Sequence, residues 1–226
     1  MNKHETRNAQ DLKPETCNMK LSEHFSLLEF TESPTARKHG IANVPPAEAV
    51  DNLRRLCENT LEPLREALQL PVVITSGFRT KALNDLLAHS SERSQHMKGQ
   101  AADFYIGQKP VSGTKFQDSS DLNRRQTESL LSSLEEGQGA KEEDEVKHET
   151  GESSLKLETP RQRLIRAFRL IIQNDAIDYD QLILYPTFIH VSYVSKEKNR
   201  RTILLSMRNG KLGYGKCSVK NALTIV

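Results

Sequence analysis

The stretch SQHMKGQAADFYI, residues 94–106, combines two polar side chains that could bind a metal with an apolar run that indicates a strand. His96 and Asp103 are potential metal ligands seven positions apart, and Gly99 lies between them. This spacing suits a loop that carries the histidine, a turn at the glycine and a strand that carries the aspartate. The apolar run from Ala101 to Ile106 predicts that strand.

A second histidine extends this candidate site. His190 lies in the apolar stretch FIHVSYV, residues 188–194, where the period of two in a strand puts every second residue on one face of a sheet. A histidine buried among apolar side chains needs a polar partner, because an unpaired buried polar group is costly. Together with His96 and Asp103, it could supply three ligands to a Zn²⁺ ion that keeps one position open.

Each of these residues also has a simpler explanation. A single histidine in a strand is more often a hydrogen-bonded residue of the core or of a cleft than a metal ligand. An aspartate at the start of a strand often caps a turn. The spacing alone therefore leaves open whether His96, Asp103 and His190 bind zinc.

The other segments predict an α+β domain. Apolar residues at helical spacing alternate along the chain with runs of β-branched residues. They predict helices at 33–40, 50–68 (kinked or split at Pro63), 81–88 and 164–172, and strands at 71–75, 101–106, 179–185, 188–194 and 202–207, the last as a hairpin partner before a turn at 209–210. This order indicates a small antiparallel sheet that carries the site, with helices packed on one side. We expect the domain to be a monomer.

Two segments contain almost no apolar residues that could enter a core. Residues 1–20 predict a flexible tail, and residues 21–226 a single domain interrupted by an insertion at 108–160. The insertion has seven Lys or Arg against twelve Asp or Glu, whereas the rest of the chain has 25 against 18. We expect the insertion to be largely disordered, with a short helix near 121–135. A solvated insert without a specific role is a simpler interpretation than a partner-binding segment.

The amino-acid composition argues against several classes of protein. The 32 basic and 30 acidic residues and the absence of Trp argue against a nucleic-acid partner. The three cysteines are widely spaced, so neither a disulfide framework nor a cysteine-based zinc site is indicated. No apolar run approaches the roughly 18–20 residues of a membrane helix, and residues 1–17 lack the apolar segment of a signal peptide. We therefore expect no membrane span and synthesis in the cytoplasm.

Several segments together resemble a known family. They are LSEHFSLLEFT (21–31), SGFR (76–79), SQHMKGQAADF (94–104), DQLI (180–183) and FIHVSY (188–193). In this order they resemble the D-Ala-D-Ala carboxypeptidase family of zinc metallopeptidases, peptidase family M15, and within it the branch often described as a C-terminal peptidase domain. The family includes wall carboxypeptidases and phage endolysin peptidases. The resemblance covers roughly residues 21–107 and 161–195.

The resemblance implies a fold, a cofactor and a substrate. The fold is the D-Ala-D-Ala carboxypeptidase or hedgehog-like type, and the cofactor is Zn²⁺ held by His96, Asp103 and His190. The substrate is a peptidoglycan stem or cross-bridge peptide that contains D-amino acids. A phage or prophage setting would explain how a chain without a signal peptide reaches the cell wall.

The resemblance also implies roles for residues around the zinc ligands. Arg79 binds the substrate carboxylate or polarises the scissile carbonyl, since a guanidinium can bind two oxygens at once; a structural salt bridge is the simpler alternative. Ser94 and Gln95 shape the loop, hydrogen-bond the ligands or contact substrate, and Tyr185 contacts substrate. Asp180 is expected to brace the site from a neighbouring strand.

One position departs from the family pattern. The family places an acidic residue, the general base, three positions before its last zinc histidine, and in this chain that position is Thr187. A threonine hydroxyl does not accept a proton at neutral pH. Asp178, Asp180 and Tyr185 are nearby substitutes, of which Asp180 is the most plausible chemically. The alternative is a domain that binds zinc and wall peptides but cuts them weakly or not at all.

Overall fold

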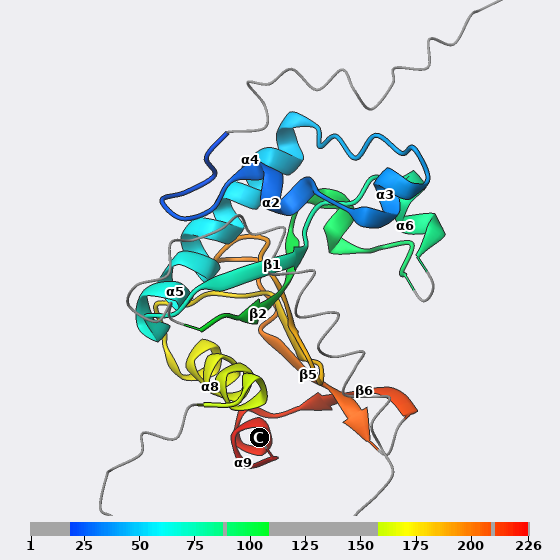
Figure 1. Cartoon of the computed structure of the whole chain (residues 1–226). Helices are drawn as coiled ribbons and strands as arrows, with labels where there is room; N and C mark the ends of the chain where they lie inside the picture. The colour runs from blue at the N-terminus through cyan, green and yellow to red at the C-terminus, as the bar shows by residue number, and fades with distance from the viewer. Residues whose placement is uncertain (1–18, 88–89, 109–157, 209–210, 226) are drawn as a thin grey trace, which may run out of the picture. The chain divides into compact units, whose positions relative to one another are not determined.

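The computed structural model describes residues 19–87, 90–108, 158–208 and 211–225 (Figure 1). Six strands in these ranges form one sheet in the order β1-β2-β4-β3-β5-β6. Their bounds are β1 Val72–Ser76, β2 Ala101–Ile106, β3 Gln181–Leu184, β4 Ile189–Ser192, β5 Thr202–Arg208 and β6 Lys211–Cys217. The α+β class predicted from the sequence is confirmed.

The sheet is larger than predicted and is mixed. All neighbouring strands pair antiparallel except β3 and β5, which are parallel. The strand predicted at 202–207 as a hairpin partner is β5, and its antiparallel neighbour is β6, the strand that follows it. Both edges of β4 are already occupied, by β2 and β3, so β5 adds to the free edge of β3 instead.

Helices account for most of the remaining described chain. They are α2 Leu27–Thr31, α3 Pro34–Lys38, α4 Ala47–Leu56, α5 Glu62–Leu68, α6 Lys81–Leu86, α8 Pro160–Gln173 and α9 Val219–Ile225, with a π-helical turn η1 at Cys57–Leu61 and a 3₁₀ turn η2 at Gln95–Lys98. The predicted start of α3 is confirmed, because the Ser33 hydroxyl accepts a hydrogen bond from Ala36 N at 3.2 Å and Pro34 takes the first helical position.

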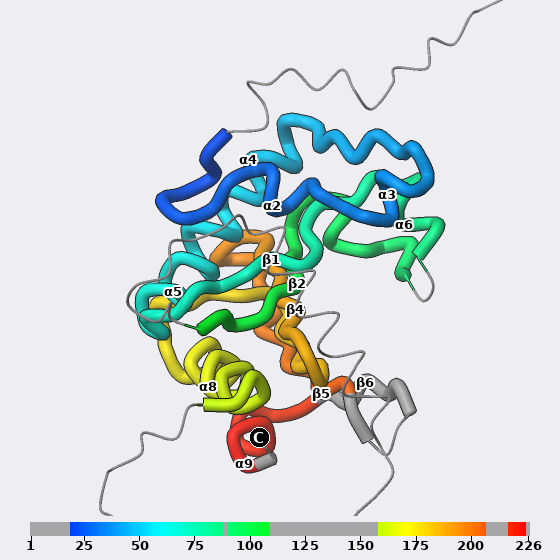
Figure 2. Tube along the Cα trace, in the orientation of Figure 1, coloured from blue at the N-terminus to red at the C-terminus, as the bar shows by residue number. Residues whose placement is uncertain are grey.

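The kink predicted at Pro63 takes the form of a π-helical turn. Figure 2 shows α4, η1 and α5 as one continuous tube. Pro63 has no N–H to donate to the carbonyl four residues earlier, and that carbonyl, Asn59 O, instead accepts Asp178 N at 3.0 Å. Thr60 Oγ1 donates to Asp178 O beside it. The interruption thus joins this helix to the segment that leads into β3.

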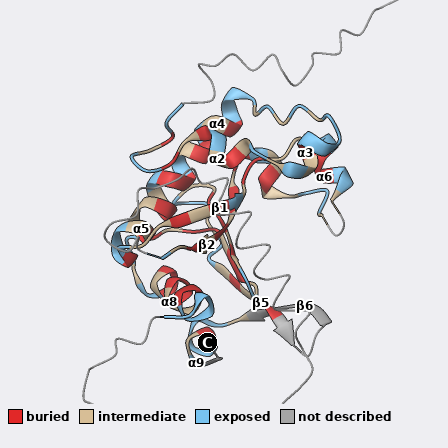
Figure 3. Ribbon diagram, viewed as in Figure 1, coloured by how far each residue is buried: buried red, intermediate tan, exposed pale blue. Residues whose placement is uncertain are grey.

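The core lies between the helices and one face of the sheet (Figure 3). Leucines of α4 and α5 and the apolar face of α8 pack in one buried cluster with alternating strand residues, among them Ala102, Phe104, Ile189 and Val191. Because successive side chains of a strand point to opposite faces, the residues between them, Asp103 and His190, lie on the other face.

Some predictions fall outside the described residues. They are the tail at 1–20, of which only residues 19–20 are described, the turn at 209–210, and the insertion at 108–160 except for its ends. The helix expected near 121–135 is one of these. In the described ranges, no helix has both the length and the apolar character needed to cross a membrane.

A buried arginine joins the two ends of the fold on either side of residues 109–157. Arg163, 3% exposed, donates from Nε to Ile106 O at 3.1 Å and from Nη1 to Glu158 O at 2.6 Å. Ile106 ends β2, and Glu158 precedes α8. The Arg163 side chain therefore links the two segments of the domain that flank residues 109–157 in the sequence.

We expect the domain to fold without residues 109–157. Replacing them with a short Gly/Ser linker should leave a cooperative thermal transition and an unchanged circular dichroism spectrum for the remaining domain. In that protein Arg163→Met should lower the free energy of unfolding by about 1.5–3 kcal/mol, because hydrogen bonds from a charged donor are lost. Arg37→Met, at an exposed residue, should change it little. A linker protein without a cooperative transition would contradict this expectation.

Candidate metal centre

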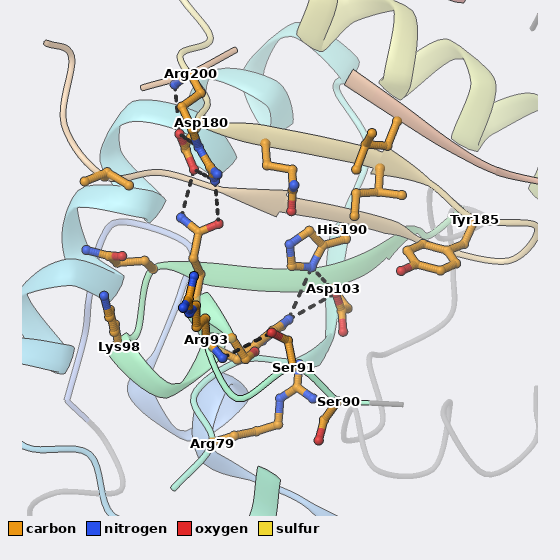
Figure 4. Close-up of a pocket in the computed structure, with 18 of the residues that line it drawn as sticks. Arg79, Ser90, Ser91, Arg93, Lys98, Asp103, Asp180, Tyr185, His190 and Arg200 are labelled. Atoms are coloured by element: carbon orange, nitrogen blue, oxygen red, sulfur yellow. Dashed lines mark hydrogen bonds and ion pairs between the residues drawn. The ribbon is translucent and has the colours of Figure 1, made fainter. Parts of the chain in front are cut away.

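Three side chains from separate segments meet on the face of the sheet opposite the core. Asp103 of β2 and His190 of β4 are direct partners in the antiparallel register, and Figure 4 shows their side chains directed toward each other. His96 reaches them from η2. The ligand atoms of the three residues all lie within 4.8 Å of one another.

The separations of these atoms fit a tetrahedral metal ion. His96 Nε2 lies 3.2 Å from His190 Nδ1 and 3.4 Å from Asp103 Oδ1, and His190 Nδ1 lies 2.8 Å from Asp103 Oδ1. Metal–ligand bonds of about 2.0–2.1 Å at tetrahedral angles require separations of about 3.3 Å. Two imidazoles and a carboxylate also form a donor set suited to Zn²⁺.

A backbone carbonyl orients the first histidine. His96 is 2% exposed, and its Nδ1 lies 2.6 Å from Gly77 O. Because a carbonyl only accepts, this bond fixes the proton on Nδ1 and leaves the Nε2 lone pair directed at the cluster. Burial lowers the pKa of His96, although Asp103 opposes this effect, so the ring is neutral, as a ligand must be.

The carboxylate of the cluster is held in its charged form. Burial by itself would raise the pKa of Asp103, but its interactions with His96 and His190 outweigh it and hold that pKa below its usual range. Asp103 therefore remains an anion at neutral pH. A charged, half-buried carboxylate beside two imidazoles is the arrangement that a cation stabilises.

The turn between the first two ligands depends on Gly99. Its φ is +67°, a left-handed conformation that favours glycine. A Cβ at this position would lie 2.3 Å from Ala49 O, so the turn also packs directly against α4. Asn52 of the same helix donates to Lys98 O at 3.0 Å.

Arg79 enters the cleft from the loop that follows β1. Asn43 braces this loop: its Nδ2 donates to Phe78 O at 2.9 Å, and its Oδ1 accepts Thr80 N at 2.9 Å. Arg79 N donates to His96 O at 3.2 Å, which links the loop to η2. Burial lowers the pKa of Arg79, and Asp103 and Tyr185 oppose this. Its Nε is buried without a hydrogen-bond partner among the described residues.

Asp180 and Gln95 belong to a bonded network at one end of the cleft. Asp180, 1% exposed, accepts hydrogen bonds from Arg200 N and Nε at 2.8 Å each and from Gln95 Nε2 at 2.9 Å (Figure 4). Burial favours the neutral acid, but the bonds from Arg200 and Gln95 outweigh it and lower the pKa of Asp180. A carboxylate engaged in this way is suited to bracing the 3₁₀ turn that carries His96.

Tyr185 lies at the opposite end of the cleft from this network. Its ring stacks on Phe188, with centroids 4.2 Å apart and an interplanar angle of 12°. Both residues line the cleft, as does Ser94. Thr187 lies between Tyr185 and Phe188 in the sequence. It is exposed and is not among the residues that line the cleft. Asp178 does not line the cleft either; its carboxylate pairs with Arg201 at 3.1 Å.

Three residues with a part in the site were not singled out from the sequence. Gly77 provides the carbonyl for His96, Asn43 braces the Arg79 loop, and Arg200 binds Asp180. The segment SGFR did mark the first of these positions. The other two are distant in sequence from their partners, and no local signal identifies them.

The fold and this site define an α+β domain with a cleft whose His/Asp/His cluster could hold a metal ion, and one comparison with known proteins agrees. Residues 23–126 match the family described as Peptidase M15. The match supports membership of the chain in peptidase family M15, a family of metallopeptidases. It contains Arg79, His96 and Asp103, whereas His190 lies beyond it. Searches of curated proteins and of solved structures returned no match.

Two glycines with similar backbone angles provide a test of the turn. Gly40 has φ +62° and open space around an added Cβ, whereas Gly99 has φ +67° and Ala49 O in the way. Gly40→Ala should lower the free energy of unfolding by about 1–2 kcal/mol through backbone strain. Gly99→Ala should lower the free energy of unfolding by more than Gly40→Ala does. It should also weaken metal binding, because the turn that carries His96 must move. Calorimetric unfolding and zinc titration measure both, and equal behaviour of the two variants would contradict the assignment.

Proposed function

We propose that the chain is a zinc-dependent peptidase that cuts D-amino-acid-containing peptides of peptidoglycan, in stems or cross-bridges. The observation that carries the proposal is the convergence of His96, Asp103 and His190 in an open cleft. A structural zinc site is normally closed by four protein ligands, whereas three ligands leave a position for water or substrate. The resemblance to D-Ala-D-Ala carboxypeptidases supports the choice of substrate.

The residues around the cluster have complementary tasks in this proposal. Zinc held by the three ligands would supply the Lewis acidity that activates water and polarises a carbonyl. Arg79 binds the substrate carboxylate or the oxyanion that develops from the scissile carbonyl. Its buried Nε has no hydrogen-bond partner among the described residues, so a substrate oxygen would satisfy it. Gly77 O and the network of Asp180, Gln95 and Arg200 hold η2 in place, and Ser94 and Tyr185 form walls that contact the peptide.

The described part of the cleft contains no carboxylate that is free to act as general base. Among the described residues that line the cleft, the carboxylates are Asp103 and Asp180, and both already have partners. Thr187 cannot replace the family's acidic residue. We therefore propose slow turnover, and the second candidate is a zinc-binding module that recognises wall peptides without cutting them. The proposed place of action, the cell wall after release from a phage- or prophage-carrying cell, rests on the resemblance alone.

Removal of a ligand tests the zinc assignment and the hydrolase assignment together. His96→Ala should weaken zinc binding by more than about 100-fold and abolish hydrolysis of purified peptidoglycan peptides. His39→Ala, at an exposed histidine outside the cleft, should retain both properties. Zinc content by mass spectrometry and product release by chromatography are the readouts. Equal hydrolysis by the wild type and His96→Ala would exclude a zinc peptidase, while zinc binding without any hydrolysis would favour the binding module.

Restoring the acidic side chain at position 187 tests the explanation for slow turnover. Thr187→Glu should raise kcat by about 10²-fold or more, because general acid–base catalysis contributes about 10²–10⁴-fold. Thr187→Gln is the matched control, since its side chain has the same length and carries no charge. The gain should appear in kcat and should require zinc. If the two variants have the same kcat, the residue at position 187 does not limit turnover.

A further inference from the structure

The cleft has a long axis that follows the strands. Its floor is built from residues that share the face of His190: Gln181 and Ile183 of β3, Tyr185 directly after that strand, and Leu204 of β5, which pairs with Ile183. His190 lies opposite Ile183, and Asp103 lies opposite His190. The metal ligands therefore lie at the middle of the floor, with open cleft along the strands on both sides of them.

One end of this axis is basic. Lys98 precedes β2 and Lys198 follows β4, and antiparallel pairing brings the start of β2 and the end of β4 to the same end of the sheet. Both lysines line the cleft. Arg200 lines it at the same end, and Figure 4 shows Lys98 and Arg200 on the side of His190 away from Tyr185.

The charges that line the cleft are unbalanced, and three of the cations lie at this basic end. Five cations line the cleft, namely Arg79, Arg93, Lys98, Lys198 and Arg200, against the two carboxylates. The carboxylates are engaged, Asp180 by Arg200 and Asp103 by the histidines. In the part of the chain that is described, Lys98 and Lys198 have no ion-pair partner. A concave surface with unpaired charges of one sign attracts a ligand of the opposite sign.

The other end of the axis is apolar. Tyr185 N donates to Phe188 O at 2.9 Å, so these two residues extend the pairing of β3 with β4 by one residue pair. Their rings stack at this position. Ile183 and Leu204 are opposite each other on β3 and β5 and extend this surface. The distance along the floor from Gln181 to Tyr185 is about 13 Å, at about 3.3 Å per residue, which accommodates about four residues of an extended peptide.

We infer that the cleft selects peptides by charge: a carboxylate side chain of the substrate binds at the end formed by Lys98 and Lys198, and apolar side chains bind at the Tyr185–Phe188 end. This inference rests on the proposed function and specifies its substrate as an acidic peptide. A peptide fits better than an extended polyanion, because only one end of the cleft is basic and the other offers rings and aliphatic side chains. The cavity, about 920 Å³, is also suited to a short peptide.

Two peptides that differ in a single group test the selection. They are fluorescent pentapeptides that end in D-Ala-D-Ala and carry either glutamate or glutamine at the second position. Their binding to the zinc-loaded protein is measured by anisotropy, and their hydrolysis is measured separately. The glutamate peptide should bind about three- to tenfold more tightly at low ionic strength, the gain expected from one or two partly exposed ion pairs. The difference should shrink toward unity in 0.5 M salt, where charges are screened within a few ångströms.

Matched lysine variants locate the effect. Lys98→Gln/Lys198→Gln should abolish the preference for glutamate over glutamine. Lys38→Gln/Lys220→Gln removes the same charge from exposed positions outside the cleft and should leave the preference unchanged. Thermal unfolding of both double variants checks that each is folded. A preference that survives in the cleft variant, or falls equally in both, would overturn the inference.

The outcome separates this inference from the proposed function. If the protein binds the glutamate peptide preferentially but hydrolyses neither peptide, charge selection stands and the peptidase assignment fails. If the protein hydrolyses both peptides and binds them with equal affinity, the peptidase assignment stands and charge selection fails. Polyphosphate that bound more tightly than the glutamate peptide and displaced it would overturn the choice of a peptide as the ligand of the basic end.

Discussion

The site depends on the register between β2 and β4. Their antiparallel pairing puts Asp103 directly opposite His190, and their neighbours in sequence, Ala102, Phe104, Ile189 and Val191, enter the core on the other face. A shift of one residue would turn a whole strand over and would put charged or polar groups among the helices. The hydrophobic effect that holds the helices on the sheet therefore also fixes the positions of two of the three candidate metal ligands. His96 adds to this rigid pair through a turn that only glycine allows, because Gly99 has a positive φ and lies against Ala49.

Support for the cluster comes from residues distant in sequence. Gly77 O orients His96, Asn43 braces the loop that carries Arg79, and Asp180 binds both Gln95 and Arg200. Each of these contacts joins two elements, so the positions of the ligands depend on packing over the whole domain. This explains why a domain with short strands can hold a half-buried carboxylate and two imidazoles close together. It also explains why Asp180, plausible as a base from its chemistry, is better suited to a structural task.

Much of the fold was predictable because its signals are local. The β-branched run at 71–75, the apolar run at 101–106 and the cap at Ser33 each report on a few neighbouring residues, and the structure contains the corresponding elements. The parallel pairing of β5 with β3 was not predictable, since a strand pattern does not specify its neighbour. The π-helical turn before Pro63 was expected only as a kink, because its form depends on Asp178, which donates to the freed Asn59 carbonyl.

The residue types of the site, the turn at Gly99 and the resemblance that groups His96, Asp103 and His190 can all be read from the amino-acid sequence. It also identified the departure at Thr187. It does not show that the ligand atoms of these residues meet, that Arg200 binds the carboxylate of Asp180, or that the cleft is basic at one end and aromatic at the other. These features appear only in the folded chain. The physical reason is that distances between segments far apart in sequence follow from strand register and core packing, which involve the whole chain at once, whereas a motif records only the residues within it.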